Sequence, residues 1–390
     1  MAEAYIVAAA RTAGGRKGGR LAGWHPADLA ASVLDALIER SGAAPDQIED
    51  VIMGCVMQAG EQSNNVARNA IMASRLPESV PGTSIDRQCG SSQQALHFAA
   101  QAVMSGTMDC VIAAGVESMT RVPMGLTSQL PAKNGFGTYK SPGIEKHYPN
   151  IVFSQFTGAE MMAEKYALSR DELDEYSYQS HQRAIAATQG GKFKDEIIPL
   201  AITRADGSTD THAIDEGIRF DVSLAGIKGV KLIAENGKLT AASSSQICDG
   251  ASGVVVVNER GLKALGAKPL ARIHHMTMMG GDPVIMLDAP LHATERALKK
   301  AGMSIEDIDL FEVNEAFAMV AMIAMRELSI PHEILNVNGG ACALGHPIGA
   351  SGARVLTTLL HEMARRGAHK GLATLCIGGG MGVAMTLERA

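Results

Sequence analysis

The chain of 390 residues is 46% hydrophobic, which is enough to bury a large core and predicts more than one structural unit. Its net charge of −6 is spread without long single-sign runs, whereas phosphate binding needs a concentrated basic surface, so nucleic acid is excluded as the main partner. No apolar run approaches the roughly 20 residues of a membrane-spanning helix, and the apolar start precedes the first basic residues, the reverse of a secretory signal.

In the first part of the chain, strand-like and helix-like segments alternate, as in an α/β protein. The predicted elements are a strand over 5–10, an amphipathic helix over 28–40, a strand over 48–54, a helix over 93–104 and a buried strand over 110–115. Between 118 and 249 the pattern changes. We expect an extended loop arm over 121–150, a helical region over 157–189 that starts at Ser169 with Glu172 as a capping box, and short strands over 200–248.

The last part of the chain repeats the order of the first. The segment 48–54 reappears as 305–311, each time after an amphipathic helix, and the same offset relates Cys89 to His346. Helices over 291–301 and 350–366 and a strand over 372–378 complete the second copy. The sequence therefore predicts a duplicated α/β unit with an insertion between its halves.

Cys89 is the candidate nucleophile, because it stands between a predicted strand and the helix over 93–104. Free N–H groups and the positive end of a helix at such a junction are expected to lower the pKa of a thiol. A lone cysteine is more often buried and inert, so the assignment of Cys89 as a nucleophile depends on the segments that accompany it in the sequence. The other cysteines stand at positions 55, 110, 248, 342 and 376, and none forms a CxxC pair. This pattern indicates reduced thiols in a cytoplasmic protein.

Three further segments supply chemical partners for Cys89. His346 precedes Pro347, which fits the first turn of a helix and would hold the imidazole at the mouth of a cleft as a base. Cys376 precedes Gly378, the first of three glycines whose amides can approach a ligand closely. Asn314 can hold a water by its amide, although a structural turn asparagine is an equal alternative. Motifs for dinucleotides, nucleoside triphosphates, serine hydrolases and zinc are absent.

The sequence resembles the thiolase family from its first predicted strand to its last. The resemblance rests on the blocks Arg87–Ser92, Asn314–Ala318, Asn338–Ala341 with Gly345–Gly352, and Cys376–Gly380. It implies a five-layered αβαβα fold of two similar halves, with a loop domain that binds coenzyme A, and a homodimer or homotetramer. The predicted units are 1–118 plus 250–267 for the N-terminal half, 119–249 for the loop domain and 268–390 for the C-terminal half.

The resemblance also assigns roles. Cys89 would be acylated, His346 would activate it, and Cys376 would exchange a proton with the acetyl-CoA carbon or the CoA thiol. One oxyanion hole would combine His346 with a water on Asn314, and a second would use the amides of Cys89 and Gly378. No tightly bound cofactor or metal is expected, since coenzyme A and acyl-CoA are substrates. The implied coenzyme A contacts are Arg219, Ala241, Ser245, Ala316 and Phe317, and Lys228 and Lys231 are weaker candidates for its phosphates.

The function implied is cleavage of 3-ketoacyl-CoA by coenzyme A. Gln155–Gly158 stands where short-chain members of the family have a Met-Gly-Thr-Thr-like segment, which favours a longer or bulkier acyl group. Five residues are expected to give a pocket for such a group, because methionines repack around varied shapes: Met119, Met124, Gly158, Met161 and Met162. The alternatives are a short-chain enzyme that makes acetoacetyl-CoA, a condensing 3-ketoacyl synthase, which should lack Cys376, and a non-catalytic protein that binds coenzyme A.

Overall fold

The computed structural model describes residues 2–204 and 206–390. Both halves alternate strands and helices as predicted. The N-terminal half contains β1 (Tyr5–Thr12), β2 (Gly15–Arg16), α1 (Pro26–Ser41), β3 (Asp50–Gly54), α2 (Val66–Ala73), β4 (Gly82–Ile85), α3 (Ser91–Ser105), β5 (Cys110–Ser118), β9 (Cys248–Val257) and α9 (Glu259–Leu265). The C-terminal half contains β10 (Ala271–Gly280), α10 (Ala289–Ala301), β11 (Leu310–Val313), α11 (Ala318–Glu327), α12 (Ala341–Leu344), α13 (Ser351–Arg366), β12 (Lys370–Ile377) and β13 (Met381–Arg389).

The central sheet has two arms. One arm has the strand order β4-β3-β5-β9-β1 and the other has the order β10-β13-β12-β11. The arms join where Tyr5 and Ile6 of β1 pair with Arg272 and Ala271 of β10. β4, which precedes Cys89, pairs in parallel with β3. β11, which precedes Asn314, pairs in parallel with β12.

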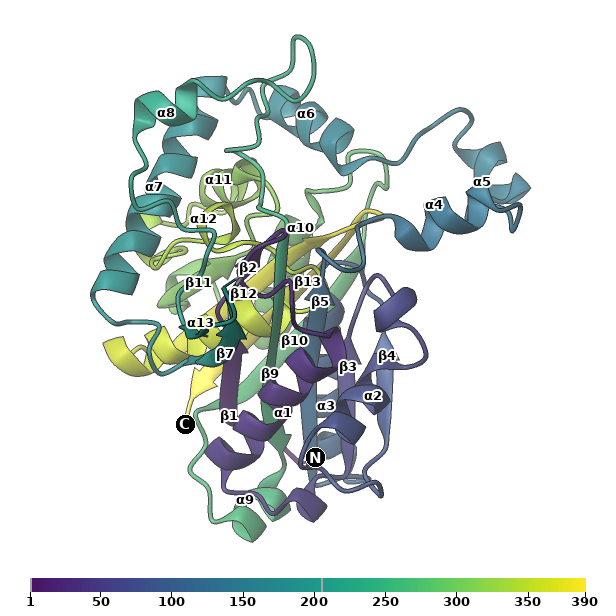
Figure 1. Cartoon of the computed structure of the whole chain (residues 1–390). Helices are drawn as coiled ribbons and strands as arrows, with labels where there is room; N and C mark the ends of the chain where they lie inside the picture. The colour runs from purple at the N-terminus through teal and green to yellow at the C-terminus, as the bar shows by residue number, and fades with distance from the viewer. Residues whose placement is uncertain (1, 205) are drawn as a thin grey trace.

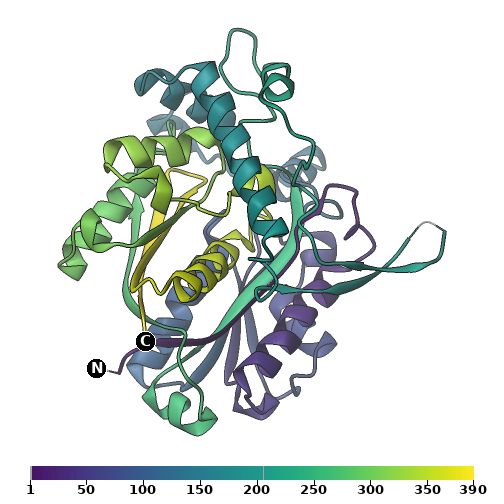
Figure 2. The ribbon, with the colours of Figure 1, turned by 90° about the vertical axis from the view of Figure 1, so that its left-hand side faces the viewer.

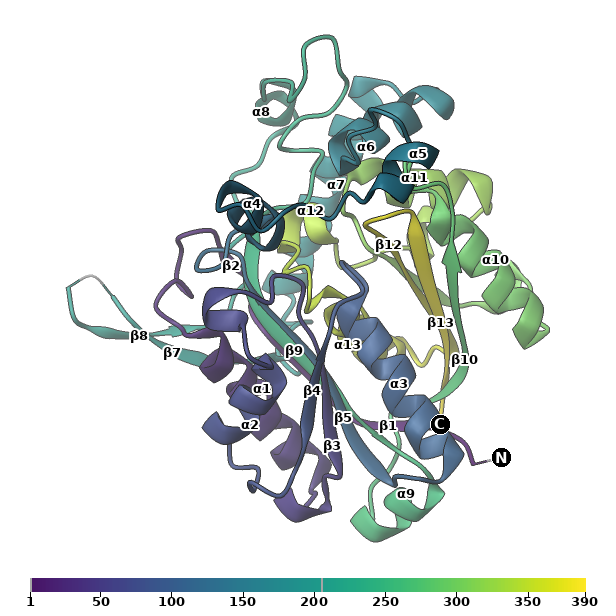
Figure 3. The same ribbon diagram turned by 90° about the vertical axis from the view of Figure 1, so that its right-hand side faces the viewer.

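Helices and sheet arms form five layers (Figure 3). α1 and α2 cover the outer face of the first arm, α3 and α13 pack against each other between the arms, and α10 and α11 cover the outer face of the second arm. Every residue of β5 is buried, as expected for a strand covered by helices on both faces. The predicted fold class is therefore confirmed, whereas the unit boundaries at 118, 249 and 267 stay a prediction.

The middle layer is closely packed because glycines allow the two halves to touch. A Cβ on Gly352, in the first turn of α13, would lie 2.4 Å from the backbone nitrogen of Gln93 in α3. A Cβ on Gly115 of β5 would lie 2.4 Å from the carbonyl oxygen of Gly349. The amide of Ala353 donates a hydrogen bond of 2.9 Å to Ser92 Oγ. The N-terminal ends of α3 and α13 are therefore in direct contact.

The insertion contains more helix than its composition indicates. Its elements are α4 (Leu126–Lys133), α5 (Pro142–His147), α6 (Gln155–Lys165), α7 (Arg170–Gln189), β6 (Ile197–Ile198), β7 (Leu200–Thr203), β8 (Thr209–His212) and α8 (Leu224–Lys228). The capping box of Ser169 and Glu172 is present. The expectation of an extended arm was wrong over α4 and α5. Pro142 begins α5, where a missing N–H costs nothing, and Ser141 caps it.

The insertion surrounds one end of the two halves. α4 and α5 project as an arm (Figure 1), and α6, α7 and α8 lie over the C-terminal half. The β7–β8 hairpin extends away from the body (Figure 2). Residues of α4 and of the start of α6 line one cavity together with Cys89, Ile348 and Gly378, so the insertion covers the ends of the segments predicted to carry the site.

Gly352→Ala should lower the free energy of unfolding by about 1–3 kcal/mol, because the new methyl group cannot avoid the backbone of α3. Gly23→Ala is the matched control, since its Cβ would meet no atom within 4 Å. Urea unfolding followed by circular dichroism measures the difference. Equal midpoints for the two variants would show that the contact between α3 and α13 is not tight.

Candidate active site

Cys89 lies directly before Gly90, the N-cap of α3. It is buried, and its sulfur accepts a hydrogen bond of 4.0 Å from Gln155 Nε2. Burial raises the pKa of the Cys89 thiol to about 11, although the backbone amide of Gly378 and the side chain of Gln155 act in the opposite direction. The expectation of a lowered pKa was therefore wrong, because loss of solvent outweighs the donors around the sulfur. At neutral pH the thiol is protonated and needs a base.

His346 is the predicted base. Burial, and to a smaller extent the charge of Arg354, lowers the pKa of its imidazole to about 3, so the ring is neutral at pH 7. Ser351 Oγ donates a hydrogen bond of 2.9 Å to the Pro347 carbonyl and therefore accepts one from His346 Nδ1. This arrangement leaves Nε2 without a proton, where it accepts a hydrogen bond of 3.4 Å from Asn314 Nδ2.

Pro347 does not occupy the first helical turn, contrary to the sequence prediction. α13 begins at Ser351, and residues 348–350 form a turn. The contact of Ser351 with Pro347 and His346 takes the place of a helix start at the proline. The imidazole is thus held before the helix rather than within it.

Asn314 and Cys376 come from adjacent parallel strands. The amide of Asn314, directly after β11, donates a hydrogen bond of 3.0 Å to Thr374 O in β12. Asn314 Oδ1 is buried and accepts no hydrogen bond from the described residues, which fits an oxygen that binds a water or a substrate group. Burial, with a smaller contribution from Cys89, raises the pKa of Cys376, so that thiol is neutral and can donate a proton.

A buried carboxylate connects the two halves of the site. Glu117 Oε2 accepts hydrogen bonds from the amides of Val56 at 2.8 Å and Gly349 at 3.0 Å. Its other oxygen accepts from the Met57 amide and from Gln62 Nε2. Glu117 therefore fixes the turn after His346 relative to the first half. Glu117 was not predicted as a site residue, although a lone acid at the end of an apolar strand was an available signal.

Cys89 opens into a cavity of about 1010 Å³. Gly378, Gln155 and Ile348 stand beside the sulfur, and α4 and the start of α6 form the walls. The apolar side chains that line the cavity include Met57, Met124, Phe136, Phe156, Met286 and Met381. The aromatic residues of the insertion were not predicted to line this cavity.

Of the five residues expected to shape the acyl pocket, only Met124 lines this cavity among the described residues. Met119 packs against Cys89 in a buried cluster, and Met162 is buried in the core of the second half. Met161 is 40% exposed. Gly158 lets α6 approach residues 284–285, because its Cβ would lie 2.6 Å from Ile285 O.

The predicted coenzyme A contacts occupy two places. Arg219 and Ala241 line a second cavity of about 430 Å³. Ser245 donates a backbone hydrogen bond of 3.0 Å to Ala316 O, and the ring of Phe317 meets Phe156 edge to face at 5.5 Å. Since Phe156 lines the first cavity, Ser245, Ala316 and Phe317 form a strip between the two cavities. The roles of these residues stay a prediction.

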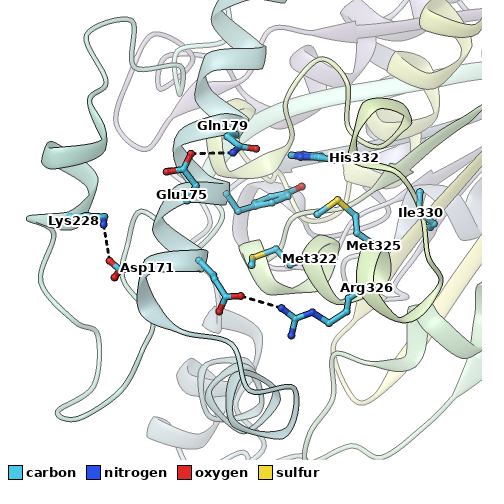
Figure 4. A pocket seen from close by; sticks show the side chains of 11 residues that line it. Asp171, Glu175, Gln179, Lys228, Met322, Met325, Arg326, Ile330 and His332 are labelled. Carbon is cyan, nitrogen blue, oxygen red and sulfur yellow. Dashed lines mark hydrogen bonds and ion pairs between the residues drawn. The ribbon is translucent and has the colours of Figure 1, made fainter.

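Lys228 lies elsewhere. Figure 4 shows a third cavity, of about 660 Å³, between α7 and α11, where Lys228 Nζ is 2.8 Å from Asp171. Met322 and Met325 form part of its wall. Lys228 is therefore already paired with a carboxylate, which weakens its candidacy for a phosphate of coenzyme A.

Within residues 2–204 and 206–390, no three His, Cys, Asp or Glu side chains group as metal ligands. No helix there combines the length and apolar character needed to cross a membrane.

The family models for the N-terminal and C-terminal domains of thiolase match residues 4–260 and 267–389. The chain belongs to the thiolase family. It is 46% identical to a protein named steroid 3-ketoacyl-CoA thiolase FadA6 of Mycobacterium tuberculosis, over 100% of this chain and 95% of the relative. It is 45% identical to an acetyl-CoA acetyltransferase of Chromobacterium violaceum, over 99% and 100%.

A solved structure agrees with this assignment. The crystal structure of the Bacillus anthracis acetyl-CoA acetyltransferase superposes with a TM-score of 0.91 at 36% identity, covering 100% of this chain and 99% of that one. The resemblance stated from the motifs is therefore confirmed, and this thiolase is an acyltransferase.

Cys89→Ala should abolish formation of an acyl-enzyme and lower turnover by about 10⁴-fold or more, because no other group can attack from that position. Cys110→Ala, at the start of the buried strand β5, is the matched control and should still be acylated. Mass spectrometry of each protein after reaction with a 3-ketoacyl-CoA, without free coenzyme A, gives the result. Acylation of the Cys89→Ala protein on another cysteine would refute the assignment.

Proposed function

We propose that this thiolase cleaves 3-ketoacyl-CoA thioesters with coenzyme A, giving acetyl-CoA and a shortened acyl-CoA, and that it prefers acyl groups bulkier than acetyl. The observation that carries the proposal is the apolar cavity of about 1010 Å³ that begins at Cys89. An acetyl group would fill little of it. The printed name of the relative from Mycobacterium tuberculosis, a steroid 3-ketoacyl-CoA thiolase, agrees with a ring-bearing acyl group.

In the first half of the proposed reaction, His346 Nε2 takes the proton of the Cys89 thiol and the sulfur attacks C3 of the substrate. The carbonyl oxygen gains the charge and accepts hydrogen bonds from the amides of Cys89 and Gly378. Collapse of this adduct breaks the C2–C3 bond, and the electron pair moves to C2 as the enolate of acetyl-CoA. Cys376 donates a proton to C2, becomes a thiolate, and acetyl-CoA leaves.

In the second half, coenzyme A donates its thiol proton to Cys376 and its sulfur attacks the acyl carbonyl on Cys89. The second adduct collapses, the bond from carbon to Cys89 breaks, and the departing sulfur recovers the proton from His346. His346 and a water on Asn314 would stabilise the enolate oxygen. The buried, unpaired Oδ1 of Asn314 supports this role, because a water donating to it would also face the ring of His346.

The cavity of Arg219 and Ala241 is the proposed place for the nucleotide end of coenzyme A. The strip of Ser245, Ala316 and Phe317 would then guide the pantetheine arm toward Cys89. The protein is further predicted to form a homodimer or homotetramer and to be cytoplasmic. Synthesis of acetoacetyl-CoA, the short-chain alternative, has less support because it leaves most of the first cavity unused.

For the unaltered protein, kcat/KM should rise from acetoacetyl-CoA to longer and ring-bearing 3-ketoacyl-CoA substrates, by up to about fourfold for each well-buried methylene. Phe136→Ala, which removes apolar lining from the arm, should lower kcat/KM for the bulky substrates and leave the value for acetoacetyl-CoA unchanged.

Leu130→Ala is the control, because Leu130 is exposed on α4, shortly before Phe136 in the chain, and is not among the residues that line the cavity. A coupled spectrophotometric assay of thiolysis across the substrate series measures both effects. A steep preference for acetoacetyl-CoA, with no cleavage of substrates of six carbons and more, would return the protein to the short-chain group.

A further inference from the structure

Gln155 is a polar residue in the otherwise largely apolar surroundings of the Cys89 sulfur. Its Nε2 lies 4.0 Å from Cys89 Sγ, at the outer limit of an N–H···S hydrogen bond. The same Nε2 is 3.5 Å from the place where a Cβ on Gly378 would be, so the Gln155 amide stands beside Gly378, whose backbone amide also lowers the pKa of the Cys89 thiol. Two uncharged N–H groups thus act on one reactive atom.

The position of Gln155 is fixed by its helix. It is the first residue of α6, directly after the N-cap Ser154, whose side chain accepts from the Thr157 amide. Gly158 holds α6 against Ile285, and the ring of Phe156 packs on Phe317. The Gln155 side chain therefore projects from a rigid element toward Cys89, as an electrostatically useful donor must.

We infer that Gln155 is a further catalytic residue, whose side-chain amide donates a hydrogen bond to the Cys89 sulfur whenever that sulfur carries negative charge. Charge forms there twice in each cycle, when His346 removes the thiol proton and when the acyl group leaves. The inference rests on the proposed function of Cys89 as nucleophile. No bond is made or broken at Gln155, and its amide keeps both protons.

The chemistry of the site makes such a donor useful. Burial raises the pKa of the Cys89 thiol, and the donors from Gln155 and Gly378 are the groups that lower it most strongly. The Gly378 donor is part of the backbone and is the same whatever the side chains are. Gln155 is a side chain, so the sequence can add or remove this donor, and an amide does so without introducing a charge that titrates.

The test is the rate of alkylation of Cys89 by iodoacetamide, measured between pH 6 and 10 with the modified peptide identified by mass spectrometry. Alkylation follows the thiolate fraction and needs neither coenzyme A nor a ketoacyl substrate. Failure of the inference is therefore distinguishable from failure of the proposed function, which thiolysis assays test. Gln155→Met, similar in size but without a donor, should react about tenfold more slowly over this range.

Gln155→Glu distinguishes a hydrogen bond from a role in shape. Glutamate matches glutamine in size but places a carboxylate beside the sulfur, so above pH 7 it should react more slowly than Gln155→Met. Gln179→Met, the same substitution in the cavity of Figure 4, is the control and should match the wild type.

The order wild type, Gln155→Met, Gln155→Glu, from fastest to slowest, supports the inference. Wild-type rates in either Gln155 variant would overturn it. If Gln155→Met does not fold, Gln155→Asn replaces it, since its amide is one methylene too short to reach the sulfur and the same tenfold loss is expected. Melting temperatures of all variants confirm that the compared proteins are folded.

Discussion

The contact between the N-terminal ends of α3 and α13 is the constraint on which the site depends. Cys89 directly precedes Gly90, the N-cap of α3, and His346 precedes the turn that leads into α13, so the contact between the helix ends sets how the proposed nucleophile and base lie relative to each other. Glycine at 352 removes the side chain that would separate them, and Glu117 fixes the turn that carries His346. The two similar halves thus each supply one member of the pair.

Burial decides the charge state of this pair. Both groups lose solvent, which raises the pKa of the Cys89 thiol and lowers that of the His346 imidazole, so both are neutral at pH 7. Charge therefore arises only during reaction, at atoms that already face donors. A site of this kind stabilises transient negative charge on sulfur and oxygen without keeping a permanent ion there.

The repeat and the motifs predicted the fold and placed Cys89 and His346 at matching positions, because both depend on local periodicity and spacing. The same reasoning was wrong for the pKa of Cys89, since burial is a property of the packed molecule. It was wrong for Pro347, because a contact with Ser351 moves the start of α13. The walls of the cavity were mostly missed, since they depend on where α4 and the start of α6 lie relative to Cys89 in the folded molecule.

The central claim is that two thiols divide the chemistry, Cys89 forming the acyl-enzyme and Cys376 moving the proton at C2. Cys376→Ala measures this division directly. The account predicts that the variant is still acylated on Cys89 by an activated acyl thioester, yet no longer exchanges the C2 protons of acetyl-CoA with deuterated solvent, as followed by NMR. Exchange at the wild-type rate in the Cys376→Ala protein would contradict it.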